Sequence, residues 1–241
     1  MQLGRSDDGR VARLTLPGGP LTATAARQLS AFASQLIEDR DVRVVVLDAP
    51  GGTDFCAGAA DDLTPDVAQP DPAAALARLR VPLIASIAGA CSSVGIELAL
   101  TCDIRLAASD ASFGVPDVAA GRLPCWGGTQ RLPRAVGASR ASWLLFTGSE
   151  IAASTALEWG LVHEVTDDLE AGVAAVLDQL AGTGPLALEL AKEAVHRGSE
   201  LPLRDGLRLE GDLNHQLAAT EDRAEGLAAF FDKRPPDFAG R

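Results

Sequence analysis

The chain has 241 residues, of which 47% are hydrophobic and 22% are charged, and its formal net charge is −12. This length is enough for one large domain or two small ones with a sizeable buried core. The strong negative charge argues against general binding to nucleic acids or anionic membranes, so we expect neither as a partner. A phosphorylated small molecule is not excluded, because it needs only a few local cations such as Arg78, Arg80 or Lys233.

The apolar runs are short and interrupted, so none is predicted to span a membrane. Residues 1–14 lack the apolar core of a signal peptide, and we therefore expect a cytoplasmic protein. The four cysteines form no Cys-x-x-Cys pair and lie far in sequence from the three histidines. This pattern predicts buried thiols rather than a zinc site or disulfides, and no metal or redox cofactor is indicated.

The first half of the chain alternates between predicted strands and helices. Thr22 or Thr24 can cap a helix that runs to about Glu38, with an apolar face. The β-branched run at 42–49 is typical of a strand that is buried on both faces. Strands are predicted at residues 11–16, 42–49, 81–89, 102–109 and 111–115.

From about residue 127 the chain is predicted to be mainly helical. Helical spacing of apolar residues covers 137–148, 153–160, 168–182, 185–198 and 224–232, with one brief strand at 161–166. Strand–helix alternation followed by a helical third predicts an α/β core with a helical C-terminal part. We place the core domain at residues 1–185 and the C-terminal helical region at residues 186–241.

Two loops, residues 55–60 (FCAGAA) and 90–95 (ACSSVG), share one design. Each leaves a predicted strand, passes through small residues and enters a helix. Backbone N–H groups at a helix start lack internal partners, and the helix dipole favours negative charge there. Two such donors that converge on one point form an oxyanion hole. Taken alone, each loop is weak evidence for such a site, and a tight strand-to-helix turn is the simpler interpretation.

Two acids accompany these loops. Glu97 lies near the start of an apolar helix, and Asp117 follows Pro116 twenty residues later. Paired carboxylates can divide acid and base roles when their surroundings separate their pKa values. The alternatives are structural: Glu97 pairs with Arg105 or faces solvent, and Asp117 caps a helix that begins after the proline.

Several ordered motifs between residues 42 and 238 resemble the crotonase, or enoyl-CoA hydratase/isomerase, superfamily. They are VRVVVLDAPGGTDFCAGAADDL, the long run from PLIASIAG to GGTQRL, GLVHEV and AFFDKRPPDF. The resemblance implies an α/β spiral of ββα units whose C-terminal helices serve trimer formation, with trimers that commonly pair into hexamers. It also implies an acyl-CoA or enoyl-CoA thioester as the substrate, so that coenzyme A is part of the substrate and not a cofactor.

The resemblance also assigns roles residue by residue. It places the two oxyanion-hole N–H groups on Ala59 and Val94 and the two catalytic acids at Glu97 and Asp117, where they would position water and exchange a proton at the α-carbon. The implied CoA contacts come from Ala57, Ala59, Ala60, Phe230 and Lys233, and the implied acyl-pocket residues are Cys125 and Trp126. Lys233 is otherwise an ordinary cation near a helix end, and Trp126 is a pocket wall or a packing residue.

Four departures from the family pattern bear on activity. Ser93, Val94 and Gly95 stand where the family has a glycine triad, and Asp117 is one methylene shorter than the usual glutamate. Ala60 replaces an aspartate, and the turn before GGTQRL reads PCWGG. These changes suggest a non-standard acyl group or a relative that has drifted from fast hydration.

The leading functional hypothesis is an enoyl-CoA hydratase, a lyase of fatty acid metabolism that adds water to a 2-enoyl-CoA. An acyl-CoA double-bond isomerase needs the same oxyanion hole and only one acid. A catalytically weak CoA-binding subunit is a third reading of the departures. A serine peptidase using Ser92 or Ser93 is disfavoured, because the segment from this helix to Gly128 contains no histidine to serve as its base.

Overall fold

Residues 1–64 and 71–241 are described by the computed structural model of the chain, and their contacts divide them into two units. Unit 1 comprises residues 1–79 and 83–173, and unit 2 comprises residues 80–82 and 174–241. The division falls inside helix α7 (Leu169–Ala181) rather than after residue 185. Its first turn packs on the sheet of unit 1, since Val173 is buried and Gly172 lies against the Leu106 side chain.

Unit 1 contains two sheets. The first has six strands in the order β1-β2-β3-β4-β6-β9, and all its pairings are parallel except that of β1 with β2. The second has three strands in the order β5-β7-β8, with β5 and β7 parallel and β7 and β8 antiparallel. The strands are β1 (Gln2–Arg5), β2 (Val11–Thr15), β3 (Val44–Asp48), β4 (Leu83–Ile87), β5 (Ala90–Ser92), β6 (Ile104–Ala108), β7 (Ser112–Gly114), β8 (Glu150–Ala152) and β9 (Glu164–Thr166).

Successive turns of the chain repeat one plan: a strand in the large sheet, a short extended segment beside the small sheet, and then a helix. The clearest turn runs through β4, β5 and helix α3 (Val94–Ala99). The same plan covers β3, Cys56 and α2 (Pro72–Ala77), because Cys56 forms a parallel bridge with Cys91 of β5. It also covers β2, Leu21 and α1 (Ala23–Glu38), because Leu21 forms a parallel bridge with Ala59. The short segments of neighbouring turns therefore pair with one another beside the large sheet, and both small-residue loops belong to these segments.

The local structure follows the sequence closely in this unit. Every residue of β3 and β4 is buried, as the apolar runs predict for strands that are covered on both faces. Thr22, and not Thr24, caps α1, since its side chain accepts a hydrogen bond from the Ala25 N–H.

One local expectation is wrong. Residues 116–121 form turns, whereas one interpretation of Pro116 and Asp117 placed the start of a helix there.

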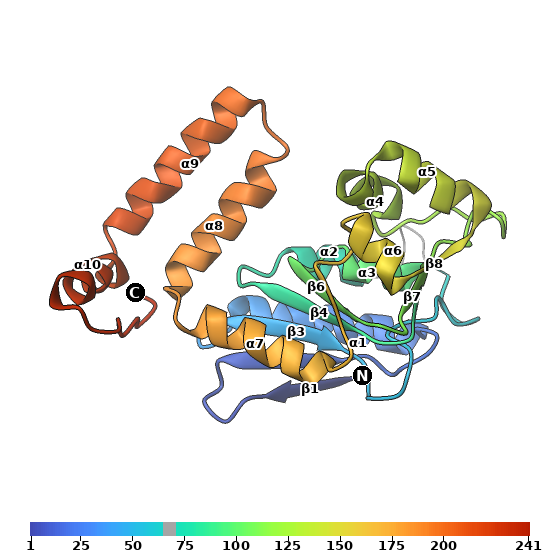
Figure 1. Ribbon diagram of the computed structural model, residues 1–241, viewed down its shortest axis with the longest axis horizontal. Helices are drawn as coiled ribbons and strands as arrows, with labels where there is room; N and C mark the ends of the chain where they lie inside the picture. The colour runs from blue at the N-terminus through green and yellow to red at the C-terminus, as the bar shows by residue number, and fades with distance from the viewer. Residues whose placement is uncertain (65–70) are drawn as a thin grey trace. The chain divides into compact units, whose positions relative to one another are not determined.

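The remaining helices of unit 1 are α4 (Gly128–Val136), α5 (Ala138–Thr147) and α6 (Ala153–Glu158). Figure 1 shows these three gathered beside β7 and β8, and α6 contacts both strands. Trp126, Phe55 and Phe113 are among the largest fully buried side chains of the core. Strands β1, β5 and β8 and helix α2 are elements that sequence patterning did not single out, since each has only three to six residues.

Unit 2 consists of helices, as expected for the C-terminal part of the chain. It contains the later part of α7, α8 (Pro185–Gly198), α9 (Leu203–Ala218) and α10 (Glu221–Asp232), and α8 packs along α9. The short segment 80–82 belongs to it because Arg80 forms an ion pair with Glu189 and the Val81 carbonyl accepts a hydrogen bond from Lys192 Nζ at 2.8 Å. Leu203, Phe230 and Phe231 are exposed on these helices.

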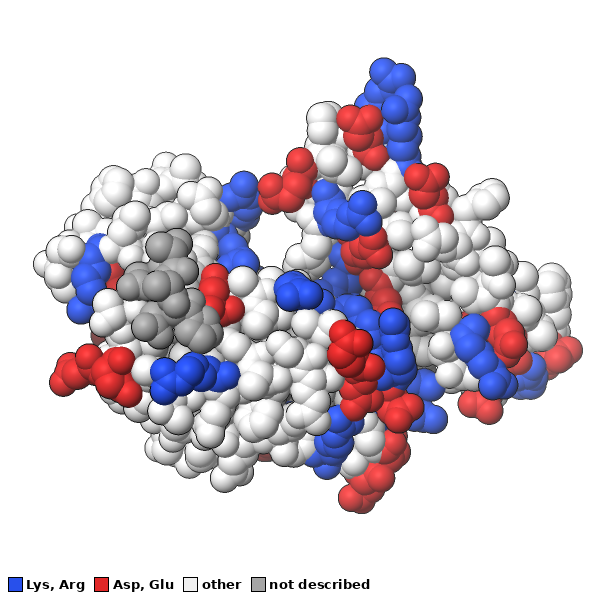
Figure 2. Space-filling view, turned by 180° about the vertical axis from the view of Figure 1, so that it is seen from behind, with Lys and Arg blue, Asp and Glu red and all other residues white. Residues whose placement is uncertain are grey.

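Charges of both signs are interspersed on the face that Figure 2 shows, where blue and red side chains alternate over short distances. No single helix among the described residues is both long and apolar enough to cross a membrane; α7 and α8 meet that test only when taken together as a bent pair.

Candidate active site

The two small-residue loops lie side by side because their backbones pair. Cys56 N–H donates to the Ala90 carbonyl at 3.0 Å, and Ser92 N–H donates to the Cys56 carbonyl at 2.9 Å. Helix α3 begins directly after this pairing and approaches the first loop closely at Gly95. A Cβ at Gly95 would lie 2.5 Å from the Cys56 carbonyl oxygen, so only glycine allows this approach. The glycine therefore sets the spacing between the two loops.

Two backbone N–H groups of these loops have no acceptor among the described residues. Within the part of the chain that the structure describes, neither Ala59 N–H nor Val94 N–H donates a backbone or side-chain hydrogen bond. Both residues line one cavity. The N–H groups of Ala57 and Ala60, by contrast, donate to the carbonyls of the Gly19–Leu21 segment. Ala59 and Val94 are the residues to which the family resemblance assigns the oxyanion hole, and that role stays a prediction.

Glu97 is buried, with 2% of its surface exposed, and backbone groups hold its carboxyl. Its Oε1 accepts hydrogen bonds from Trp126 N–H at 2.7 Å and from Gly128 N–H at 2.8 Å. A Cβ at Gly128 would lie 3.1 Å from both Cγ and Oε1 of Glu97, so a glycine lets this N–H come close. Arg105 is not the partner of Glu97, because its guanidinium donates to the carbonyls of Leu161 and Cys102.

The surroundings of Glu97 raise its pKa from the ordinary 4.5 to about 7. Burial is the largest cause, because it removes water from the charged form. The two N–H groups of Gly128 and Trp126 act in the opposite direction, and the negative charges of Asp117 and Asp71 raise the pKa further. Near neutral pH this carboxyl therefore exists in both protonation states, which suits a group that gives and takes a proton.

Asp117 is the second buried acid, with 7% of its surface exposed. Its Oδ1 accepts a hydrogen bond from Ser93 Oγ at 2.7 Å and lies 3.8 Å from Arg122 Nε. Its Oδ2 is buried and has no hydrogen-bond partner among residues 1–64 and 71–241. Asp117 does not cap a helix, since it lies in the turns between β7 and α4.

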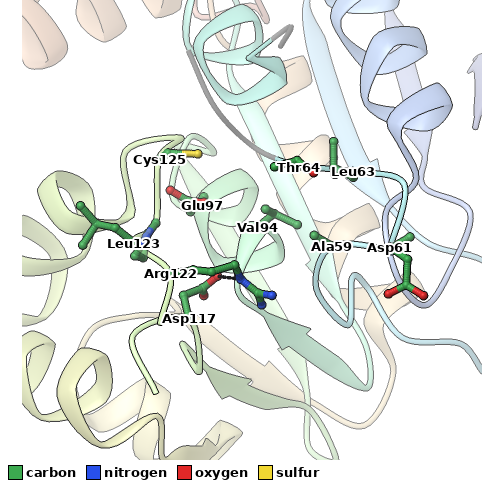
Figure 3. A pocket seen from close by; sticks show the side chains of 12 residues that line it. Ala59, Asp61, Leu63, Thr64, Val94, Glu97, Asp117, Arg122, Leu123 and Cys125 are labelled. Atoms are coloured by element: carbon green, nitrogen blue, oxygen red, sulfur yellow. Dashed lines mark ion pairs between the residues drawn. The ribbon is translucent and has the colours of Figure 1, made fainter. Parts of the chain in front are cut away.

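These groups surround one cavity of about 420 Å³. Figure 3 shows Glu97 and Asp117 on one side of it, Val94 and Ala59 toward the other, and Arg122 beside Asp117. The lining residues are Ala59, Ala60, Asp61, Leu63, Thr64, Val94, Glu97, Asp117, Arg122, Leu123, Pro124 and Cys125. Two acids and two unpaired N–H donors from three separate segments, the loop at Ala59, helix α3 and the turn at Asp117, therefore meet at one site.

The other predicted site residues are placed as follows. Cys125 is exposed and lines the cavity, whereas the Trp126 indole is 1% exposed and lies in the core, so that this residue serves the site through its backbone N–H. Phe230 is 77% exposed on α10, and Lys233 caps the end of that helix in the left-handed conformation. Both belong to unit 2.

Sequence reasoning did not assign site roles to Ser93, Arg122 and Gly128. Ser93 was noted only as a replaced glycine and as the nucleophile of a disfavoured serine peptidase, and neither pointed to Asp117. Arg122 lies in a segment without regular structure and Gly128 is the first residue of α4, and no spacing rule connects either of them to Glu97 or Asp117. Among the described residues, no group of three or more His, Cys, Asp or Glu side chains is arranged to hold a metal ion.

Similarity to known proteins extends along nearly the whole chain. The 2,3-dehydroadipyl-CoA hydratase of Escherichia coli is 40% identical over 241 aligned positions, covering 92% of this chain and 94% of that protein. Human mitochondrial enoyl-CoA hydratase domain-containing protein 2 is 37% identical, covering 86% of this chain and 77% of that protein. The crystal structure of an enoyl-CoA hydratase from Bacillus anthracis has a TM-score of 0.92 at 34% identity, covering 100% of this chain and 99% of that one.

The solved structure confirms the predicted crotonase-like α/β fold with a helical C-terminal region. A family model described as enoyl-CoA hydratase/isomerase matches residues 20–241, a range that includes both loops and both acids. The chain therefore belongs to the enoyl-CoA hydratase/isomerase family, within the crotonase superfamily.

Proposed function

We propose that this protein is an enoyl-CoA hydratase, a lyase that adds water across the C2–C3 double bond of a 2-enoyl-CoA thioester. The observation that carries the proposal is the meeting of two buried acids, Glu97 and Asp117, with the unpaired N–H groups of Ala59 and Val94 around one cavity. The names of the relatives agree with this reaction class.

The N–H groups of Ala59 and Val94 would bind the thioester oxygen. Hydration forms a C3–O bond and a C2–H bond as the C2–C3 π bond is lost, and negative charge passes through the thioester oxygen on the way. Two preorganised donors, one in the first loop and one at the start of α3, stabilise that charge in the transition state. Both roles use only the backbone, so alanine and valine can fill them.

Glu97 and Asp117 would handle the protons. One carboxylate takes a proton from the attacking water, and one carboxylic acid delivers a proton to C2. A pKa of about 7 at Glu97 allows it to hold either form at neutral pH. Each turnover leaves one carboxyl with an extra proton and the other without one, so a proton returns between them through solvent or bound water before the next turnover.

We further propose that coenzyme A, as part of the substrate, contacts the first loop at Ala57, Ala59 and Ala60. Since the N–H groups of Ala57 and Ala60 are already used, such contacts would use their carbonyl oxygens, of which that of Ala60 also accepts a hydrogen bond from Leu63 N–H at 2.9 Å. The exposed apolar side chains of unit 2 support assembly into a homotrimer or a pair of trimers. In such an assembly Phe230 and Lys233 would reach the coenzyme A of a neighbouring subunit.

The first test is spectrophotometric. Purified protein should remove the enoyl-thioester absorbance of short and medium 2-enoyl-CoAs, and Glu97→Gln or Asp117→Asn should abolish this turnover. Glu158→Gln, which removes an exposed carboxylate on α6, is the matched control and should keep parental rates. Binding of CoA esters without turnover by the parent would refute the hydratase proposal.

An acyl-CoA double-bond isomerase is the second candidate, because Oδ1 of the shorter Asp117 is tied to Ser93 and one acid is enough to move a proton between carbons. A 3-enoyl-CoA substrate separates the two activities. Gain of enoyl-thioester absorbance without uptake of ¹⁸O from labelled water would favour the isomerase. Formation of a 3-hydroxyacyl-CoA containing one ¹⁸O from a 2-enoyl-CoA would favour the hydratase.

A further inference from the structure

Ser93 has a backbone conformation that strongly favours glycine. Its φ is 52° and its ψ is −119°. Only one other described residue besides the glycines, Lys233, has a positive φ, and its ψ of 40° places it in the ordinary left-handed region at a helix end. A residue with a Cβ is strained in the conformation of Ser93, and such strain persists where the surrounding structure imposes it, often at functional sites.

Backbone hydrogen bonds hold Ser93 in this strained conformation. Ser93 N–H donates to the Gly114 carbonyl at 3.0 Å, and the Ser93 carbonyl accepts from Ile96 N–H at 3.0 Å and Glu97 N–H at 3.3 Å. These bonds join β7 to the first turn of α3. Glycine would satisfy all of them without strain, because none uses the side chain. The serine hydroxyl must therefore be explained by what it contacts.

The usual reason for a serine at this place does not apply. Ser93 is the N-cap residue of α3, where a hydroxyl normally accepts a hydrogen bond from an N–H in the first turn. Here the side chain makes no such bond. Instead, its hydroxyl donates to Oδ1 of Asp117 at 2.7 Å, in a contact that is buried on both sides. The hydroxyl thus serves the second acid and not its own helix.

Asp117 has few other restraints on its carboxyl. It lies in a turn, its Oδ1 is 3.8 Å from Nε of the exposed Arg122, and its Oδ2 has no hydrogen-bond partner among the described residues. The hydroxyl of Ser93 is therefore the close contact that selects the orientation of this carboxyl. It occupies Oδ1 and leaves Oδ2 for proton transfer.

We propose that Ser93 is a positioning residue that holds Asp117 in its reactive orientation. This inference rests on the proposed reaction at the same site. It gives the replacement of glycine by serine a function, because the shorter acid reaches less far and a misplacement of about 1 Å can cost on the order of 100-fold in rate. The Ser93 hydroxyl compensates for the shorter reach of Asp117 by fixing the direction of its carboxyl.

Ser93→Gly separates this role from a structural one. Glycine removes the hydroxyl and also relieves the backbone strain, so the melting temperature should stay the same or rise. We expect kcat for hydration to fall about 10- to 100-fold, the range for losing one hydrogen bond to a charged group, with KM changed less than about 2-fold. Ser92→Ala at the neighbouring serine is the matched control and should keep the parental kcat.

A double-mutant cycle supplies the second readout. If Ser93 acts through Asp117, Ser93→Gly should change the residual rate less than about 2-fold in an Asp117→Ala background. A parental kcat in Ser93→Gly, or an equal fall in both backgrounds, would overturn the positioning role. Failure of the proposed function is distinguished within the same experiment, because the parent itself would then show no hydration. That result would refute the reaction and, with it, the role assigned to Ser93.

Discussion

Replacing Glu97 by glutamine should stabilise the protein at alkaline pH while it abolishes hydration. Burial raises the pKa of this carboxyl from 4.5 to about 7. The folded protein therefore resists ionisation of Glu97, and stability that is present below pH 4.5 is lost as pH rises toward and through 7. At about 1.36 kcal/mol per pH unit, the difference between the two pKa values amounts to about 3 kcal/mol at pH 8 and about 1 kcal/mol at pH 5.

Glutamine removes this cost because it is neutral at every pH tested. Its side-chain oxygen can still accept the N–H groups of Trp126 and Gly128, so the buried donors keep their partner. The favourable difference between variant and parent should then grow by about 2 kcal/mol between pH 5 and pH 8. For a chain of this length that is a relative rise in melting temperature of about 4–8 °C.

Thermal unfolding of both proteins at pH 5, 6, 7 and 8 measures this difference, at one protein concentration because assembly also affects stability. Glu158→Gln controls for the general loss of a negative charge and should give a difference that does not grow with pH. A constant difference between Glu97→Gln and the parent, or a variant that is less stable at pH 8, would refute the account of Glu97 as an acid kept partly protonated by burial.

Two further outcomes follow from the cavity walls. Gly128→Ala should lower kcat at least about 10-fold, because the added Cβ would lie 3.1 Å from Oε1 of Glu97 and 2.9 Å from the Pro124 side chain. Gly4→Ala is the control and should keep the parental kcat, because a Cβ at Gly4 has no neighbour within 4 Å. Initial rates measure both effects. Iodoacetamide should modify Cys125 first among the four cysteines, as shown by mass spectrometry, because it alone is exposed. Burial also raises the pKa of the Cys91 thiol and raises that of Cys56 to about 11. A bound CoA ester should slow that modification, and equal labelling with and without it would contradict the placement of this thiol at the cavity.

The sequence was sufficient for the large elements and for the order of the site motifs. The apolar run around β3 and the capped helix α1 follow from periodicity and side-chain chemistry, both of which act between near neighbours. The four groups of the candidate site could be selected only through the family motifs. No local rule indicates that Glu97 and Asp117 meet, because their meeting depends on how β5 and β7 align in the second sheet.

The contacts that tune the site lie beyond such rules. The partners of Glu97 are N–H groups some thirty positions later in the chain, and a backbone donor has no sequence signature. Arg105, which one structural alternative paired with Glu97, instead donates to the carbonyls of Leu161 and Cys102, which are far from each other in sequence. The structural alternatives, in which Glu97 pairs with Arg105 or faces solvent, are therefore both wrong, and the catalytic role of Glu97 stays a prediction.

The two places where local rules fail most clearly are neighbours in the structure. A serine before a helix should cap it, yet Ser93 adopts a glycine conformation and gives its hydroxyl to Asp117. A glutamate in an apolar helix should be paired with a cation or exposed, yet Glu97 is buried on backbone donors with its pKa near 7. Each departure lowers the stability of the fold, and such departures are maintained where function requires them. Both departures lie in or next to the first turn of α3, and each determines the state of one of the two acids. We therefore expect this turn to be less stable than an ordinary helix start, because its geometry is set by the site.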